Sequence, residues 1–468
     1  MLVPALLIWI VVSGVSRASD PASSELAPNA QAPNVVIIYC DDLGYGDLGC
    51  YGHPTIKTPN LDRMAAEGLK FTSFYSAAPV CTPSRAALMT GRLPIRNGMC
   101  SSRRRVLFPD SAGGLPDSEI TIAELLKQNG YATGCVGKWH LGHHPQFLPT
   151  AQGFDAYFGI PYSNDMDRLN DIGPRGRQAF LEPDTRYWNV PLMSNEEIIE
   201  RPADQNTITR RYTEASIEFI QAHRDKPFFL YLAHSMPHVP LFASERFRNT
   251  SERGLYGDVI EEIDWSVGQI LQTLRDEGIE EQTLVFFSSD NGPWLVFDLH
   301  GGSAGLLRGG KGSTWEGGMR VPGIAWWPGH IEAGRVTSDM ACTMDLFVTL
   351  SSMVGQPLPD DRAYDGFDLT DLLMGTGPST RDVMYYYRDD RLLAVRKGPW
   401  KMHLETQAGY GQAEPTVHDP PALYHLGYDA SEKNDVSAAN PEVVTELRSM
   451  LEQHAGTVEP VESQLERR

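Results

Sequence analysis

The sequence predicts an α/β fold with a largely parallel sheet, followed by a smaller α+β domain. From Asn34 onward, apolar segments of strand length alternate with segments of helical periodicity, as in parallel sheets covered by helices. Near residue 375 the pattern changes to short segments separated by tight turns, which indicates antiparallel strands. The chain has 468 residues, of which 41% are hydrophobic and 21% charged. That composition provides a large core and excludes disordered and collagen-like classes.

The first 18 residues predict a signal peptide, and residues 19 to 32 predict a linker. The initial apolar run is too short to span a bilayer, and Ser16 and Ala18 stand in positions typical of a cleavage site. An uncleaved membrane anchor is the alternative. We expect an exported protein without stable membrane insertion: periplasmic or secreted, or lysosomal if the source is eukaryotic.

Four apolar segments have the length and composition of buried strands. They are "NVVIIYCDD" (34–42), "YATGCVGKWH" (131–140), "PFFLYLAHSMPH" (227–238) and "TLVFFSSDNG" (283–292). Their polar ends are, in turn, Asp41 and Asp42, Lys138 and His140, His234 and His238, and Asp290 and Asn291. Open α/β sheets bind ligands beyond the carboxyl ends of their strands, so the four ends predict one crevice. A helix cap or a turn explains any single end, but not the joint pattern.

Three helices are predicted between these strands, at 59–69, 120–130 and 257–279, where apolar residues recur at helical spacing. Trp265 lies in the third of them and continues its apolar pattern. We therefore expect this tryptophan to be a core residue rather than a functional one.

The chain divides into two predicted domains, 33–375 and 376–468, at the Gly/Pro/Ser-rich stretch "GTGPSTRD". The second would carry a small antiparallel sheet and end with a helix. Asn440 is the expected cap of that helix and Pro441 its first residue.

Charge and cysteine content exclude several classes of function. The formal net charge of −20 argues against nucleic-acid binding and against adsorption to anionic membranes. The six cysteines include no C-x-x-C pair, which argues against a structural zinc site. An exported protein could pair some of them as disulfides, but six are few for a disulfide scaffold of this length.

The segment "CTPSR" (81–85) places a thiol at the start of a predicted helix, one turn before an arginine. Thr82 suits the N-cap and Pro83 the first helical position, so Cys81 is expected just outside the helix, where free N–H groups favour negative charge. Arg85 could then donate two hydrogen bonds to a tetrahedral oxyanion. A buried thiol is one interpretation. A thiolate phosphatase is another, although its chemistry needs a longer cysteine–arginine spacing.

The C-x-P-S-R motif, followed by an apolar helix and "TGR", resembles the signature of the sulfatase family. In that family the cysteine is oxidised after synthesis to Cα-formylglycine by an enzyme that reads the Cys, Pro and Arg. Nearly the whole chain shares the resemblance through "DDLGYGDLGCYGHP", "GYATGCVGKWHLG", "GIPYSND", "HSMPHVP", "SSDNGP" and "GLLRGGKGSTWEGGMRVP". It implies an alkaline-phosphatase-like fold, with a mixed, mostly parallel sheet flanked by helices. Residues 33–375 would then be the catalytic domain of an arylsulfatase A-like sulfuric ester hydrolase.

Asp41, Asp42, Asp290 and Asn291 offer hard oxygen ligands from two strand ends, which suits Ca²⁺ or Mg²⁺ and not zinc. The residues alone do not choose between the two ions. The resemblance implies Ca²⁺, with modified Cys81 as the fifth protein ligand and a sulfate oxygen completing the shell. Such an ion would polarise the sulfate and lower the pKa of the aldehyde hydrate.

The resemblance also implies roles for the basic side chains. Arg85 and Lys138 would hold the modified residue and balance the carboxylates, and Lys311 would bind the sulfate and its bridging oxygen. His140 would orient the hydrate or take its proton, and His238 would be the general acid to the leaving alcohol.

In the implied reaction one hydroxyl of the formylglycine hydrate attacks sulfur and a covalent sulfate ester forms as the alcohol leaves. The second hydroxyl then expels sulfate and restores the aldehyde. The expected substrate-binding residues are Lys138, Ser163, His238 and Lys311. The acidic envelope favours a small or terminal sulfate ester over a long polyanion. A formylglycine-generating enzyme is the implied partner during maturation, and the sequence does not indicate an oligomeric state.

Two alternatives remain beside a sulfatase. A phosphatase, phosphodiesterase or phosphonate hydrolase of the same superfold is one, although most of these use Ser or Thr where Cys81 stands. The other is a catalytically dead protein that binds sulfated ligands. Substrate specificity is expected in the loops 101–115, which includes the basic run "RRR", 164–200 and 293–303. "GLLRGGKG" nearly matches a phosphate-binding loop, but Gly312 stands where Ser or Thr must hold magnesium.

Overall fold

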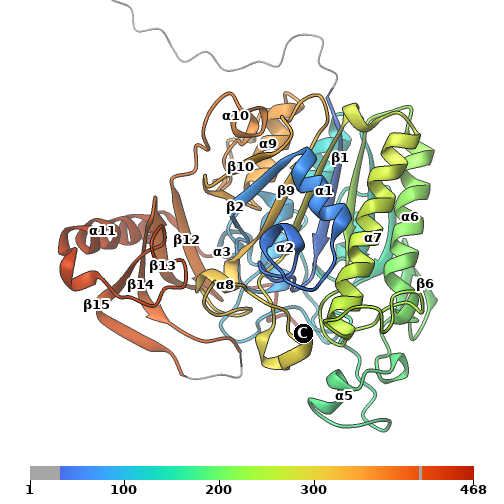
Figure 1. Ribbon diagram of the computed structural model, residues 1–468, viewed down its shortest axis with the longest axis horizontal. Helices are drawn as coiled ribbons and strands as arrows, with labels where there is room; N and C mark the ends of the chain where they lie inside the picture. The colour runs from blue at the N-terminus through green and yellow to red at the C-terminus, as the bar shows by residue number, and fades with distance from the viewer. Residues whose placement is uncertain (1–31, 411–413) are drawn as a thin grey trace, which may run out of the picture. The chain divides into compact units, whose positions relative to one another are not determined.

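A mixed sheet of eleven strands forms the centre of the computed structural model, which describes residues 32–410 and 414–468 (Figure 1). Its strand order is β10–β2–β9–β8–β1–β7–β3–β4–β5–β6, and β11 pairs with β2. The strands are β1 Asn34–Cys40, β2 Leu69–Tyr75, β3 Ala132–Lys138, β4 Ala156–Ile160, β5 Leu192–Ser194, β6 Glu197–Glu200, β7 Phe228–Ala233, β8 Thr283–Ser289, β9 Arg320–Trp326, β10 Arg335–Thr337 and β11 Ala341–Cys342.

The four strands predicted from the sequence lie next to one another in the middle of this sheet. The neighbouring pairs β8–β1, β1–β7 and β7–β3 are all parallel, so their carboxyl ends meet at one edge. Alternate residues of β1 enter two different hydrophobic clusters: Val35, Ile37 and Tyr39 enter one, and Val36 and Ile38 the other. Burial on both faces explains why these strands are continuous apolar runs rather than alternating ones.

Helices cover both faces of the sheet. The cluster of Val36 contains residues of α1, α6 and α7, and that of Val35 contains residues of α2, α4, α9 and α10. Helices α6 and α7 lie side by side in Figure 1. The helix bounds are α1 Pro59–Glu67, α2 Cys81–Thr90, α3 Pro94–Asn97, α4 Ile122–Gln128, α5 Gln178–Leu181, α6 Ile208–His223, α7 Leu255–Asp276, α8 Glu316–Met319, α9 Asp345–Met353, α10 Thr370–Met374 and α11 Pro441–Thr457.

The three predicted helices correspond to α1, α4 and α7. Trp265 in α7 is half-buried and packs its ring 5.8 Å from that of Phe247. It therefore contributes to packing, as expected, although at the margin of the core.

A second, antiparallel sheet of four strands follows in the order β12–β13–β14–β15, with α11 packed against β13 and β14. Its strands are β12 Val383–Arg388, β13 Arg391–Lys397, β14 Trp400–Thr406 and β15 Thr416–His425. Helix α11 begins at Pro441 after Asn440, as predicted, but the Asn440 side chain donates to the Val436 carbonyl oxygen at 2.9 Å instead of capping the helix. The mostly parallel sheet with helices and the separate antiparallel sheet confirm the predicted fold class.

The predicted signal peptide (1–18) and linker residues 19–31 lie outside the described residues. Residues 32–468 cluster as one compact unit. In the described part of the chain, no helix has both the length and the apolar character that a membrane span requires.

Candidate active site

The ends of β1 and β8 bring four polar residues together: Asp41, Asp42, Asp290 and Asn291. The Asp290 backbone N–H donates to the Cys40 carbonyl oxygen at 3.0 Å, and the Asp42 N–H donates to Asp290 Oδ1 at 3.1 Å. Asp42 has a φ of 67°, a left-handed conformation that aspartate tolerates better than most residues. This turn at the strand end aims Asp41 and Asp42 at a common point.

Cys81 lies in the first turn of α2, and this corrects the predicted helix start. The helix begins at Cys81, with Val80 in the N-cap position and the Ser84 N–H donating to the Val80 carbonyl. Thr82 does not cap the helix: it lies inside the first turn, and its hydroxyl donates to the His140 carbonyl oxygen at 3.0 Å and accepts from the Leu107 N–H at 3.3 Å. Cys81 is 2% exposed, and burial raises the pKa of its thiol to about 11. An unmodified Cys81 would therefore be a protonated, weak nucleophile at neutral pH.

Three buried carboxylates face three buried cations at this edge of the sheet. Lys138 Nζ lies 2.5 Å from Asp41 Oδ2, and Lys311 Nζ lies 2.8 Å from Asp42 Oδ1. Arg85 donates from Nε and Nη2 to Asp290 Oδ2 at 3.0 and 2.9 Å. The cluster consists of Asp41, Asp42, Asp290, Arg85, Lys138 and Lys311. We call these six residues the strand-end cluster.

The pKa values of the carboxylates reflect this crowding. Burial and the neighbouring Asp41 raise the pKa of Asp290 to about 7. Burial alone would raise the pKa of Asp41, but Lys138, His238 and Arg85 hold it well below its ordinary value. The cluster thus concentrates three carboxylates in a small buried volume, where three cationic side chains compensate their charge.

The orientation of Arg85 corrects one expectation. Its guanidinium is fully buried, and besides Asp290 it donates to the Lys138 carbonyl oxygen at 2.8 Å. It is not among the residues that line the cavity above Cys81. Arg85 therefore balances the carboxylates, and its donors are not directed at an oxyanion in the cavity.

Two buried acceptor atoms of the site have no hydrogen-bond partner among the described residues: Asp41 Oδ1 and Asn291 Oδ1. Asn291 uses its Nδ2 to donate to Asp42 Oδ1 at 2.7 Å and to the Gly292 carbonyl at 2.9 Å, which leaves Oδ1 free. Buried acceptors without partners are costly unless something else compensates them. A hard cation would do so.

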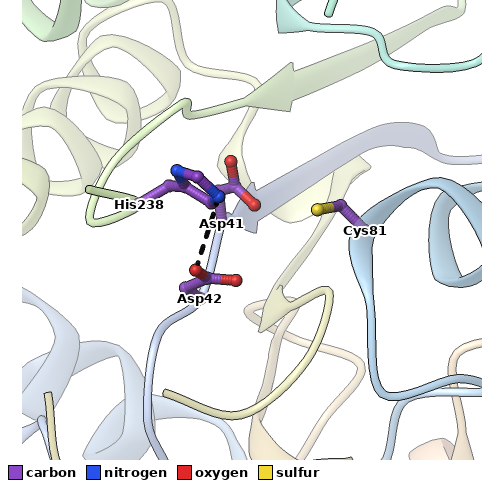
Figure 2. Close-up of side chains that lie close together, drawn as sticks. All are labelled: Asp41, Asp42, Cys81 and His238. Atoms are coloured by element: carbon purple, nitrogen blue, oxygen red, sulfur yellow. Dashed lines mark ion pairs between the residues drawn. The ribbon is translucent and has the colours of Figure 1, made fainter. Parts of the chain in front are cut away.

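Four potential ligand atoms, from Asp41, Asp42, Cys81 and His238, lie within 4.8 Å of one another. Figure 2 shows the Cys81 sulfur pointing toward Asp41, with the ion pair between His238 and Asp42 drawn as a dashed line. Ca²⁺ and Mg²⁺ prefer oxygen ligands, so the unpartnered oxygen of Asn291 fits such an ion better than the imidazole does. Of the predicted ligands, Asp41, Asp42, Cys81 and Asn291 fit such a cation. Asp290 is not in this group, and both of its carboxylate oxygens already accept hydrogen bonds, from the Asp42 N–H and from Arg85.

His140 has one ring nitrogen bonded and one free. Its Nε2 lies 2.9 Å from the Leu107 carbonyl oxygen, which can only accept, so Nε2 carries the hydrogen. Burial, together with Lys138, holds the pKa of His140 well below its ordinary value, so the ring is neutral. Its Nδ1, unpartnered among the described residues, is then a lone pair available to accept a proton.

His238 is bonded to a backbone carbonyl through the other ring nitrogen, Nδ1, so its Nε2 faces the site. Its Nδ1 donates to the Val239 carbonyl oxygen at 2.6 Å and lies 3.0 Å from Asn164 Oδ1. Its Nε2 lies 3.6 Å from Asp42 Oδ2 and 3.5 Å from Ser163 Oγ. Ser163 also accepts from Lys138 Nζ at 3.2 Å. His234, by contrast, is buried beside Ser266 and does not line the cavity.

A narrow cavity of about 30 Å³ opens above Cys81. Of the predicted residues, those that line it are Cys81, His140, Ser163, His238 and Lys311. Lys311 Nζ lies 3.8 Å from Cys81 Sγ. The predicted residues that stand behind this lining are Asp41, Asp42, Arg85, Lys138, Asp290 and Asn291.

Six further residues line this cavity, namely Arg105, Phe108, Asp165, Met166, Trp294 and Tyr410. The sequence indicated Arg105 as part of the basic run but did not single out the other five. Four of the six lie in the loops where specificity was expected, 101–115 and 164–200, and Trp294 lies in 293–303. Tyr410 comes from the chain after β14, and no sequence signal connects it with residue 81.

Family models match the chain in two parts. Residues 33–356 match the model described as sulfatase, and residues 379–468 match the model of the C-terminal region of aryl-sulfatase. Arylsulfatase A of Homo sapiens is 43% identical over 447 residues, which are 90% of this chain and 87% of that protein. N-acetylgalactosamine-6-sulfatase of Canis lupus familiaris is 42% identical over 492 residues, covering 98% and 91%.

Solved structures give the same result. The crystal structure of the PsFucS1 sulfatase from Pseudoalteromonas sp. matches with a TM-score of 0.81 and 30% identity. The match covers 91% of this chain and 90% of that one.

Proposed function

This chain belongs to the sulfatase family and is a sulfuric ester hydrolase, and from that premise we propose that Cys81 is its modified residue. The observation that carries the proposal is the position of Cys81, which lies at the floor of the cavity beside Lys311 and within 4.8 Å of the Asp41 and Asp42 ligand atoms. Oxidation to Cα-formylglycine would replace the thiol by an aldehyde whose hydrate offers one hydroxyl to attack sulfur and another to release sulfate.

We assign the metal site to Asp41, Asp42, Asp290, Asn291 and modified residue 81. A bound Ca²⁺ would supply Lewis acidity toward the sulfate oxygens. The unpartnered oxygens of Asp41 and Asn291 support this assignment. A thiol is a poor ligand for so hard an ion, which is a further reason for an oxygen-bearing side chain at position 81.

The two histidines divide the proton transfers. His140 presents the lone pair of Nδ1 to the cavity and would take a proton from the hydrate. His238 presents Nε2 beside Asp42 and Ser163. Its Nδ1 already carries a hydrogen, and burial together with Lys311 holds the pKa of the ring well below its ordinary value, so Nε2 would have to gain a proton before it could give one to the leaving alcohol oxygen. Each ring is fixed by a backbone carbonyl at its other nitrogen, so the two roles cannot be exchanged by rotation of the rings.

The cavity dimensions support a small or terminal sulfate group as the substrate. A water molecule needs roughly 10–15 Å³ of such space, so a cavity of about 30 Å³ admits little more than one sulfuryl group. Lys311 and Ser163 line it and would bind the sulfuryl oxygens, with Lys138 behind Ser163. The rest of the substrate would remain at the mouth.

Burial of Cys81 also bears on maturation. The side chain is 2% exposed in the folded chain, so we infer that a formylglycine-generating enzyme acts before folding is complete.

The experiment that tests this proposal combines mass spectrometry with turnover. The peptide containing residue 81 is expected to be lighter by about 18 Da than its thiol form. Cys81→Ala is expected to abolish sulfate release from phenyl sulfate, while Cys50→Ala, a half-buried cysteine outside the site, retains it. A fully active protein with an intact thiol at position 81 would refute the assignment. Turnover of phenyl phosphate in preference to phenyl sulfate would favour the phosphatase alternative.

A further inference from the structure

The mouth of the Cys81 cavity carries a cation that no described carboxylate neutralises. Of the three consecutive arginines in the 101–115 loop, Arg103 pairs with Glu466 at 3.3 Å and Arg104 pairs with Asp110. Arg105 is exposed and lines the mouth, and it forms no ion pair with any residue that the structure describes. In a chain with a net charge of −20, an arginine left unpaired beside an anion-binding cavity is an unexpected feature.

Aromatic rings hold Arg105 in place. Its guanidinium carbon lies 5.4 Å from the ring centroid of Tyr410 and 5.9 Å from that of Phe108. These distances are within the range of cation–π attraction. Stacking fixes the plane of a guanidinium without using its N–H donors, so the donors of Arg105 stay available to a ligand.

Tyr410 is itself fixed from the C-terminal sheet. Its hydroxyl donates to Asp389 Oδ1 at 2.9 Å, and the guanidinium carbon of Arg388 lies 4.7 Å from its ring centroid. The ring also packs on the loop that carries Lys311. A Cβ added at Gly312 would lie 2.5 Å from Tyr410 Cδ2, so this contact requires glycine. Tyr410 thus connects the C-terminal region to both the sulfate-binding lysine and Arg105.

We propose that Arg105 binds a second anionic group of the substrate, a carboxylate or a second sulfate, next to the sulfate that is cleaved, and that Tyr410 positions it. The inference rests on the proposed site. The cavity holds about one sulfuryl group, so the atoms that bear a neighbouring group must lie at the mouth, where Arg105 is. Asp165 also lines the mouth and would repel an anion. A second anionic group therefore has one favourable position, at Arg105.

The test measures binding in Cys81→Ala protein with Ca²⁺, where the ligand stays intact. The ligands are phenyl sulfate, 3-carboxyphenyl sulfate and benzene-1,3-diyl disulfate. The two dianions are expected to bind about tenfold more tightly than phenyl sulfate, the value of one charge-assisted hydrogen-bonded pair. Arg105→Gln is expected to remove this preference and to leave phenyl sulfate affinity within about twofold. Comparing the affinities of 3-carboxyphenyl sulfate and benzene-1,3-diyl disulfate decides whether Arg105 prefers a carboxylate or a sulfate.

Three further variants separate local binding from general electrostatics. Arg103→Gln, in the same loop, is the matched control and is expected to keep the preference. Tyr410→Ala is expected to weaken it, and Tyr410→Phe to retain most of it because the ring remains. The proposal is overturned if Arg105→Gln weakens all three ligands equally, or if Arg103→Gln has the same effect.

The same comparison in the unsubstituted enzyme uses the ratio of kcat/KM for 3-carboxyphenyl sulfate to that for phenyl sulfate. This ratio is expected to fall about tenfold in Arg105→Gln. A wild-type enzyme that hydrolyses neither ester would contradict the proposed function, whereas the binding ratios would still decide the role of Arg105.

Discussion

Two buried clusters of charged side chains in this protein have similar composition but differ in how their atoms are paired. In the strand-end cluster, Asp41 Oδ1 has no hydrogen-bond partner among the described residues, and the cluster adjoins a cavity. The second cluster, which we call the Glu316 cluster, consists of Glu316, Lys401, Glu432 and His403. In it Lys401 Nζ reaches three acceptors, Thr314 O at 2.8 Å, Glu316 Oε1 at 2.9 Å and Glu432 Oε1 at 3.0 Å.

The carboxylate of Glu316 is equally well satisfied, although Nδ1 of His403 in the same cluster has no hydrogen-bond partner among the described residues. Tyr75 and Arg320 donate to its Oε2, and Lys401 and Tyr386 donate to its Oε1. Lys311 and Glu316, the first residue of α8, are only a few residues apart in the chain. Lys311 nevertheless belongs to the strand-end cluster and Glu316 to the Glu316 cluster. Burial of charged side chains alone therefore does not identify an active site. What distinguishes the active site is a buried polar atom without a hydrogen-bond partner that lies beside a cavity.

The largest expected effect comes from removing the metal. Chelation is expected to abolish turnover, and added Ca²⁺ to restore it, because Asp41 Oδ1 and Asn291 Oδ1 accept no hydrogen bond from the described residues that could replace the ion. Ca²⁺ at a hundredfold excess over its Kd should also raise the free energy of unfolding by about 2.7 kcal/mol. Calorimetric melting with and without chelator, beside a turnover assay, measures both.

Asn291→Ala provides the control for this prediction. It removes one of the oxygens assigned to the ion, so the stabilisation by Ca²⁺ is expected to shrink or vanish in this variant. Full turnover by the chelated wild-type enzyme, or an undiminished response to Ca²⁺ in Asn291→Ala, would show that the open acceptors have another purpose.

The next effect concerns the Glu316 cluster and appears in stability. Lys401→Met leaves Glu316 and Glu432 buried without their shared cation, and such a loss costs about 3–5 kcal/mol. Denaturant unfolding would measure it. Turnover per folded molecule is expected to change far less than in a variant of the strand-end cluster. A Lys401→Met protein of wild-type stability would mean that the Glu316 cluster does not contribute to the free energy of unfolding.

The sequence predicted the strand-end cluster far better than the Glu316 cluster, for a physical reason. Residues such as Asp41 and Asp290 directly follow buried strands, and parallel strands bring such ends together without further information. Glu316, Lys401 and Glu432 come from a short helix, an inner strand of the second sheet and a loop, and no local pattern connects them. Their pairing depends on how the two sheets pack together.

The same reason explains two other differences. Tyr410 reaches the cavity mouth through that packing, and its neighbours in the sequence are small or polar residues that form no recognisable pattern. The Thr82 cap was predicted wrongly because its hydroxyl makes two tertiary hydrogen bonds instead: it accepts from the Leu107 N–H and donates to the His140 carbonyl oxygen, both far away in the chain. Local capping preferences yield when a tertiary hydrogen bond competes for the same side chain.

A smaller effect is expected from acid. Burial alone would raise the pKa of Glu316, but Lys401, Arg320 and Arg396 hold it well below its ordinary value of 4.5. A carboxylate with a depressed pKa in the folded state adds stability above the unfolded pKa, and this is lost as the pH falls through the folded pKa. The difference in unfolding free energy between wild type and Lys401→Met is therefore expected to shrink as the pH falls below 4.5. A difference that stays constant to low pH would contradict this account.

The smallest effect is expected from Lys397→Met, which serves as the matched control for Lys401→Met. Lys397 lies on β13, the strand beside β14, and its Nζ pairs with Glu446 of α11 at 2.7 Å. Both side chains are about half exposed, so solvent and salt screen the pair and its loss is not expected to move the unfolding midpoint measurably. A loss of stability as large as that of Lys401→Met would show that removing any lysine near this sheet destabilises it. The contribution of the Glu316 cluster would then have to be assigned to net charge rather than to burial.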